Sequence, residues 1–154
     1  MNQWFKLIVM QQEISALPDF MDYYDRELEE ARKEVKIQGS LEKESARLPG
    51  YFEHRFAQLQ EIEGVLEYFK KQEENEKNKK IRHFKEHYNT ELSDRNAERY
   101  ASTDPEVLFW SECILHIGVL HKQMLGVTKA LDTKNFQIGH IIRLRTAGIE
   151  DATI

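Results

Sequence analysis

The chain has 154 residues, a formal net charge of −5 and 32% charged residues. Its length is typical of a single domain of roughly 100–200 residues, so two separate folding units are not expected. Seven Gly and three Pro are too few for a turn-rich β-sandwich, and the composition predicts an all-α protein. The single cysteine, Cys113, excludes an internal disulfide and a Cys-rich zinc site, and its apolar neighbours place it in the core.

The first ten residues, MNQWFKLIVM, are mostly apolar. They lack the basic region and the small-residue cleavage site of a signal peptide, and they are too few to cross a bilayer. We therefore expect a soluble, cytoplasmic protein.

Acidic and basic residues are segregated along the chain. Residues 13–44 hold ten Asp or Glu and five Lys or Arg, whereas residues 77–88 hold five Lys or Arg and one Glu. Residues 129–146 carry four Lys or Arg and one Asp. Such an uneven distribution indicates a polyanionic partner that contacts only part of the surface.

The first half of the chain is predicted to be helical. Acidic residues in a first turn and a Gly-Ser pair after the last turn predict a helix over residues 19–35. A short element follows in SLEKESARLPG, and Pro49, which is tolerated in a first turn, opens a long helix over residues 51–88. Residues 70–80 of that helix are polar all round, which predicts that it leaves the core or hinges there.

The second half begins with NTELSDRNAERYAS, which is predicted to be a loop. The sequence then has Thr103 as an N-cap, followed by Pro105 and Glu106, and this arrangement predicts a helix start. Residues 132–135 separate this helix from a last helix over residues 136–148, which gives a C-terminal helical hairpin and leaves residues 149–154 as a loose tail. The first helix of the hairpin carries a coiled-coil stripe at alternating 3- and 4-residue steps: Trp110, Cys113, Ile117, Leu120, Met124, Val127 and Leu131.

A second, flanking apolar stripe on the same helix includes Val107, Ile114, His121 and Leu125. Two stripes leave more apolar area than a monomer of this size easily hides, so we expect a homo-oligomer with the hairpin at its interface. The alternative is a monomeric bundle whose own helices cover both stripes. The predicted interface residues are Trp110, Ile117, Leu120, Met124, Val127, Leu131, Phe136 and Ile141.

The basic segment KNKKIRHFKEHYN combines cations with aromatic rings. Single-stranded nucleic acid is bound by cations that follow the phosphates and by rings on which bases stack. The alternative is a solvated helix, because Ile81, Phe84 and Tyr88 share a helical face and suit a core equally well. Arg143 and Arg145 are candidates for either DNA or interface contacts. The predicted nucleic-acid-binding residues are Lys77, Lys79, Lys80, Arg82, Phe84, Lys85, Tyr88, Arg143 and Arg145.

Signals for catalysis are weak. His83 and His87 stand four apart, but Glu does not follow the first His as it does in zinc hydrolases. Glu112 and His116 lack the second Glu-x-x-His motif of a di-metal bundle. The sequence has no Gly-rich phosphate loop and no GxSxG motif. We therefore expect no catalytic activity, no metal and no cofactor.

Four segments, in this order, resemble the UvsY-type recombination mediators of T4-like phages. These are the pattern Leu41-x-x-Glu44-Ser45-x-x-x-Pro49, the basic stretch 79–88, ERYASTDPEVLFW, and KNFQIGHIIRLRTAG. The resemblance covers roughly residues 35–148. The family's Tyr-Tyr followed by a Gly turn is His87-Tyr88-Asn89 in this chain, and residues 1–34 match no part of the family pattern.

The resemblance implies a ring-like homo-oligomer of six or seven subunits that binds single-stranded DNA, loosens the single-strand-binding protein and helps a RecA-like recombinase to load. It places the protein in the host cell cytoplasm. The implied organisation is an acidic segment over residues 1–34, a helical DNA-binding and oligomerisation domain over residues 35–148, and the tail. A ring would multiply a modest basic patch through effective concentration. The alternative function is a coiled-coil structural or adaptor protein that does not bind nucleic acid.

Overall fold

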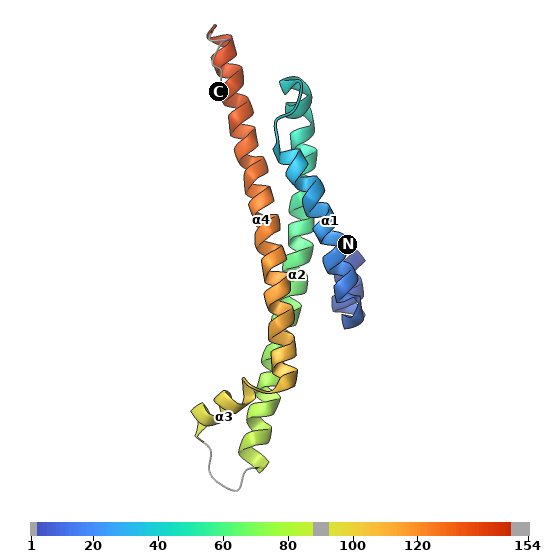
Figure 1. Cartoon of the computed structure of the whole chain (residues 1–154), viewed down its shortest axis with the longest axis vertical. Coiled ribbons are helices and arrows are strands. Elements are labelled where there is room, and N and C mark those ends of the chain that lie inside the picture. The colour runs from blue at the N-terminus through green and yellow to red at the C-terminus, as the bar shows by residue number, and fades with distance from the viewer. Residues whose placement is uncertain (1–2, 88–92, 149–154) are drawn as a thin grey trace. The chain divides into compact units, whose positions relative to one another are not determined.

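The computed structural model describes residues 3–87 and 93–148. Within these ranges every regular element is a helix, which confirms the all-α prediction (Figure 1). No helix in the described ranges combines the length and the apolar character needed to cross a membrane. The elements, in chain order, are η1 (Phe5–Met10), η2 (Ile14–Ala16), α1 (Leu17–Val35), α2 (Leu41–His87), α3 (Asp94–Ala101) and α4 (Pro105–Thr146).

The contacts divide the chain into two compact units. Unit 1 combines the residues up to Leu17 with Glu61–His121, and unit 2 combines Pro18–Gln60 with the residues from Lys122 onward. Helices α2 and α4 contribute to both units. Residues 3–17 and residues 18–34 belong to different units.

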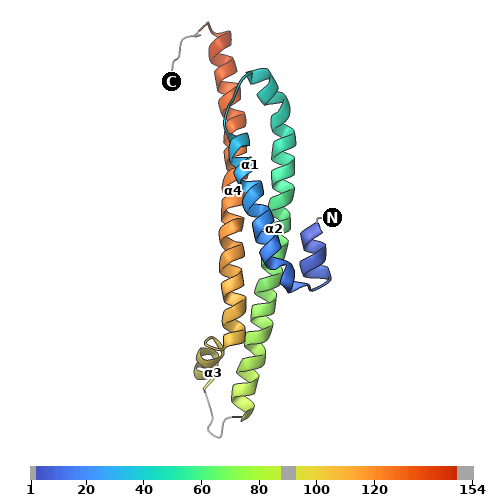
Figure 2. The same cartoon turned by 45° about the vertical axis from the view of Figure 1, so that its right-hand side comes forward.

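Unit 1 contains the second part of α2 beside the first part of α4, with α3 next to them (Figures 1 and 2). Phe69 of α2 and Trp110 of α4 pack edge to face with ring centroids 5.5 Å apart. The N-terminal segment completes the core of this unit, because Ile8 is fully buried and the backbone N–H of Phe5 donates to a carboxylate oxygen of Glu61 over 2.9 Å. The apolar opening of the sequence is therefore part of a folded core.

Unit 2 contains α1, whose predicted span is confirmed to within two residues. Asp19 lies in its first turn, and Gly39, with a φ of 83°, lies in the turn that leads to α2. The left-handed backbone at this turn favours glycine because a side chain would be strained there. The buried face of α1 has helical spacing and consists of Phe20, Tyr24, Leu28 and Ala31.

Helix α2 is one continuous helix. The sequence instead predicted a short element and a second helix that begins after Pro49. Proline inside a helix removes one hydrogen bond and costs about 3 kcal/mol. The helix nevertheless continues, because Leu48 and Leu59 are buried on either side of the proline. The polar residues 70–80 also stay helical, and one of them, Glu73, accepts a hydrogen bond from the Ser111 hydroxyl of α4.

Helix α3 occupies part of the segment predicted to be a loop. Ser93 caps it, with its hydroxyl oxygen accepting from the Asn96 backbone N–H over 3.4 Å. The buried residues are Ala97 and Ala101, four apart on one face. Two alanines are a weak apolar signal, and for that reason the periodicity of this short helix was missed.

Helix α4 is also continuous, so the predicted C-terminal hairpin is wrong. Residues 132–135 contain no Gly or Pro, and Lys134 is only 2% exposed. Its ammonium donates to the backbone carbonyls of Glu34 and Lys36 over 2.7 and 2.9 Å and to the carboxylate of Glu44. These contacts join this part of α4 to the end of α1 and the start of α2, within unit 2.

The ends of α4 follow known capping patterns. Asp104, and not Thr103 as predicted, is the N-cap residue, because its carboxylate accepts from the Glu106 backbone N–H over 3.0 Å. Pro105 then fills the first helical position, where its missing N–H costs nothing. Gly148, with a φ of 77°, follows the last turn as predicted.

Most of the stripe predicted to form an oligomer interface lies in the core of the single chain. Cys113 is only partly buried, as is Trp110. Of the other two predicted interface residues, Phe136 is 71% exposed and Ile141 is partly buried. The structure thus corrects the predicted role of the stripe members that it buries: Ile117, Leu120, Met124, Val127 and Leu131.

Candidate nucleic-acid interface

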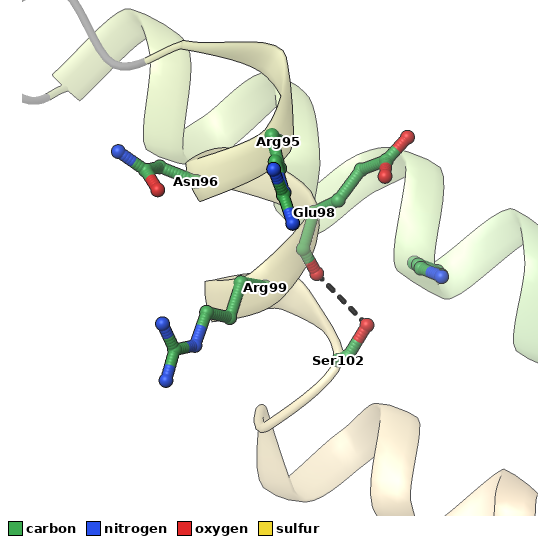
Figure 3. A pocket seen from close by; sticks show the side chains of 6 residues that line it. Arg95, Asn96, Glu98, Arg99 and Ser102 are labelled. Carbon is green, nitrogen blue, oxygen red and sulfur yellow. Dashed lines mark hydrogen bonds between the residues drawn. The ribbon is translucent and has the colours of Figure 1, made fainter.

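A basic hollow of about 590 Å³ lies in unit 1 between α2 and α3, and we call it the α3 hollow (Figure 3). In Figure 3 the side chains of Arg95, Asn96 and Arg99 project from the ribbon of α3. Arg95 and Arg99 stand four apart and are exposed, on the side of α3 away from its buried alanines. The residues that line the hollow are Lys77, Arg95, Asn96, Glu98, Arg99 and Ser102.

Positive charge exceeds negative charge in the α3 hollow. Three of the lining side chains are cationic, and Glu98 is the only carboxylate among them. The Ser102 hydroxyl donates to the backbone carbonyl of Glu98 over 2.8 Å. A guanidinium can donate two parallel hydrogen bonds to a phosphate, and two guanidiniums one helical turn apart can contact the same or neighbouring phosphates. The chemistry of the hollow therefore suits a phosphate-bearing ligand.

Two of the predicted cations form ion pairs with carboxylates from beyond the end of α2. The Lys80 ammonium lies 2.9 Å from Glu106 and 3.3 Å from Asp104, and the hydrogen bond to Glu106 is the largest contribution that raises its pKa. Lys85 pairs with Asp94 at the start of α3, and this pairing lowers the pKa of the Asp94 carboxyl. A phosphate would have to compete with these carboxylates, so neither lysine is a ready contact.

The other predicted cations are distributed over several places. Lys77 lines the α3 hollow, whereas Lys79 pairs with Glu76 over 3.2 Å. Arg82 is exposed, and the structure records no ion pair for it with another described residue. Arg143 and Arg145 are exposed near the end of α4 in unit 2.

The predicted aromatic contacts are partly accounted for by packing. The ring of Phe84 is half-buried and its centroid lies 5.9 Å from that of Tyr100 on α3, so Phe84 supports the fold. Tyr100 is about half exposed and follows Arg99 directly. Its outer face is a candidate for stacking that sequence analysis missed. Tyr88, a predicted site residue, lies outside the described residues.

The two histidines of HFKEH lie together on the exposed face of α2. Their rings are stacked with centroids 4.3 Å apart, and His87 Nδ1 lies 3.1 Å from the His83 carbonyl oxygen. Over residues 3–87 and 93–148 no group of three or more His, Cys, Asp or Glu is placed to hold a metal ion. The stacked pair is a local feature of the last turns of α2.

Arg95 and Arg99 were missed because their segment was predicted to be a loop. The signals that could have found them are Ser93 as an N-cap followed by an arginine pair spaced one turn apart. Such a pair has no common face in a loop, but it has one in a helix.

Comparisons with protein-family models, with curated proteins and with solved structures found no match to this chain. The resemblance to UvsY-type mediators therefore stays a prediction from the sequence.

Proposed function

We propose that this chain is a non-catalytic mediator of DNA recombination that binds single-stranded DNA at the α3 hollow. In this proposal it forms a ring-like homo-oligomer and loads a RecA-like recombinase onto strands covered by single-strand-binding protein, during recombination-dependent replication and repair. The observation that supports DNA binding is that three cationic side chains line one hollow whose lining includes a single carboxylate. The recombination context is supported by the sequence resemblance over residues 35–148.

The binding site revises the one expected from sequence. Lys77 remains in it, Arg95 and Arg99 join it, and the half-exposed Tyr100 follows Arg99 directly in the chain. Base stacking on such a ring contributes about 1–3 kcal/mol. One hollow per chain is a modest site, and several copies that engage one strand would convert it into tight binding.

Fluorescence anisotropy with labelled oligo-dT tests the proposal directly. We expect the double variant Arg95→Gln, Arg99→Gln to bind at least tenfold more weakly at low salt. The matched control is Arg26→Gln, Arg32→Gln, which changes the net charge equally at two exposed positions of α1 in unit 2 and should bind like the parent. We call the Arg95→Gln, Arg99→Gln protein the α3 variant. Equal binding of oligo-dT by the parent and the α3 variant would refute the site.

The salt dependence gives an independent readout. For single strands the logarithm of the binding constant falls with the logarithm of salt concentration by about 0.7 per neutralised phosphate. If the three cations of the hollow each neutralise one phosphate, the slope per hollow is about −2. The α3 variant should retain roughly a third of that slope, and an unchanged slope would mean that the phosphates lie elsewhere.

A coiled-coil structural or adaptor protein is the second candidate. It is favoured by the ion pairs of Lys80 and Lys85, which reduce the free positive charge of the predicted basic segment. This candidate predicts self-association without affinity for oligo-dT. Sedimentation with and without the oligonucleotide separates the two functions.

A further inference from the structure

Helix α4 carries a second stripe at heptad spacing, on the face turned away from the core. Its members follow one another at alternating steps of 4 and 3 residues, and every one of them is exposed. The buried residues of α4, such as Ile117 and Leu120, lie on the opposite face. We call this set the outer stripe: Leu108, Glu112, Leu115, Val119, Lys122, Gly126, Lys129, Thr133, Phe136, His140 and Arg143.

The chemistry of the outer stripe changes along the helix. Its first four members are Glu112 and three apolar residues, and the most exposed of these apolar residues, Leu115, is 65% exposed. Its later members include Lys122, Lys129 and Arg143 around Phe136, the most exposed of the large apolar side chains in the described residues. One end of the stripe is apolar and acidic, and the other end is apolar and basic.

We propose that the outer stripe is the seam of an antiparallel dimer in which α4 pairs with α4 of a second copy. Antiparallel coiled coils place the two kinds of core position, a and d, opposite each other. The register in which each pair of facing residue numbers sums to 255 does this for every member of the stripe except Leu108. The pairs are Glu112 with the partner's Arg143, Leu115 with the partner's His140, Val119 with the partner's Phe136, Lys122 with the partner's Thr133, and Gly126 with the partner's Lys129.

The charges at the two ends of the stripe favour the antiparallel orientation. A parallel pair would place Lys122, Lys129 and Arg143 against the same residues of the second copy, and like charges in contact are unfavourable. The antiparallel pair places Glu112 against the partner's Arg143 twice, once at each end. It also packs Val119 against the partner's Phe136. In the single chain both side chains are exposed to water.

Gly126 supports a close approach of the two helices. A glycine inside a helix costs about 1 kcal/mol relative to alanine. A Cβ atom at Gly126 would meet no other atom within 4 Å, so nothing in the single chain requires the missing side chain. In the proposed register Gly126 lies next to the two-fold axis, opposite the partner's Lys129, where a glycine leaves room for the long side chain.

The inference rests on the self-association in the proposed function and not on nucleic-acid binding. It assigns self-association to exposed residues in place of the buried stripe. A two-fold dimer uses this surface once on each copy, so a ring-like assembly would need a second surface. Each dimer would carry two α3 hollows.

Disulfide cross-linking tests the pairing and its direction. In a Cys113→Ser background, we expect Val119→Cys mixed with Phe136→Cys to form a mixed disulfide dimer under mild oxidation. Neither variant alone should cross-link, because like positions would lie 17 residues apart along the helix, about 25 Å. Efficient cross-linking of Val119→Cys with itself would show a parallel pair and overturn the proposal, as would the absence of the mixed dimer.

A charge exchange gives a second readout. Sedimentation equilibrium should show dimerisation weakened at least tenfold by Glu112→Arg and recovered when Arg143→Glu is added to the same chain. The control Arg32→Glu changes an exposed residue of α1, off the stripe, and should leave the dimer intact. If Glu112→Arg has no effect, or if the parent is a monomer, the inference fails. A stable dimer without affinity for oligo-dT would instead refute the proposed function and leave this inference standing.

Discussion

Gly64 of α2 is a residue that the packing of unit 1 requires to be small. A Cβ atom at this position would lie 2.7 Å from the Phe5 ring, closer than nonbonded carbon atoms approach. Glycine costs helix stability, so the close contact with the N-terminal segment explains its presence here. The same segment is held by the Phe5 backbone hydrogen bond to Glu61, three residues earlier on α2.

We predict that Gly64→Ala lowers the free energy of unfolding by about 1–2 kcal/mol, because the shift forced on Phe5 outweighs the gain in helix propensity. The control is Gly118→Ala in α4 of the same unit, where a Cβ would meet nothing within 4 Å. It should be neutral or stabilising by up to about 1 kcal/mol. Urea unfolding followed by circular dichroism measures both, and a stabilising Gly64→Ala would contradict the packing.

Arg55 of α2 is buried in unit 2 and joins two carboxylates of α1. Its guanidinium donates to both carboxylate oxygens of Glu34, over 2.7 and 2.8 Å, and to the Glu27 carboxylate. Gln58 also donates to Glu27 over 2.7 Å. Burial raises the pKa of the Glu27 carboxyl, but the hydrogen bonds from Gln58 and Arg55 and the charge of Arg55 together lower it below its ordinary value.

A lowered pKa makes this cluster sensitive to acid. The ionised Glu27 stabilises the folded state above the pKa of the unfolded chain, near 4.5, and this contribution is lost as the pH falls through the lower folded value. Relative to Glu27→Gln, the parent should therefore be more stable at pH 6 by about 1–3 kcal/mol, and the difference should shrink towards pH 3. Unfolding at several pH values measures it, with the exposed Glu53→Gln as control. A difference independent of pH would exclude the ion pair as its cause.

At the scale of elements, the sequence predicted helix positions better than helix ends. The start and end of α1 were predicted because acidic residues and Gly39 act locally. The sequence did not predict that α2 continues through Pro49 or that α4 continues through residues 132–135. This continuity depends on partners that are distant in the chain. Lys134, for example, finds its acceptors about a hundred residues away in the chain.

The candidate site shows the same limit. The cluster of basic residues at 77–88 predicted a binding region, and one of its members, Lys77, lines the α3 hollow. Which cations are neutralised could not be predicted, because the partners of Lys80 and Lys85 come from beyond the end of α2. The arginines of α3 required the segment to be recognised as a helix first.

The ion pair between Lys85 and Asp94 links the end of α2 to the first turn of α3. We predict that Asp94→Asn increases the affinity for oligo-dT about two- to fivefold, because Lys85 is released and a negative charge is removed beside α3. The control is Asp19→Asn, an equivalent change in the first turn of α1 in unit 2, which should have no effect. Weaker binding by Asp94→Asn would mean that the pair positions α3 and does not compete with phosphate. Anisotropy titrations at one salt concentration measure both variants.

At the scale of the molecule, a net charge of −5 has to be reconciled with the proposed binding to a polyanion. The acidic residues concentrate in α1 and at the start of α2, which belong to unit 2, while the α3 hollow belongs to unit 1. Exposed charges further apart than about 10 Å are largely screened at 0.1 M salt. A local excess of two positive charges in the hollow, three cations against Glu98, can thus bind phosphate despite the total charge.

Assembly should then decide how tightly a long strand is held. We predict that a variant with Val119→Asp and Phe136→Asp, which places carboxylates on the outer stripe, is monomeric and binds a short oligo-dT of about six nucleotides, enough for one hollow, within twofold of the parent. A strand of about 40 nucleotides can reach both hollows of a dimer, so the parent should bind it at least tenfold more tightly than the variant. The control Arg32→Glu, on α1 and off the stripe, should retain the parent's preference for the long strand. Equal losses on both strands would show that the stripe itself contacts DNA, whereas equal binding of the long strand would show that the hollows act singly.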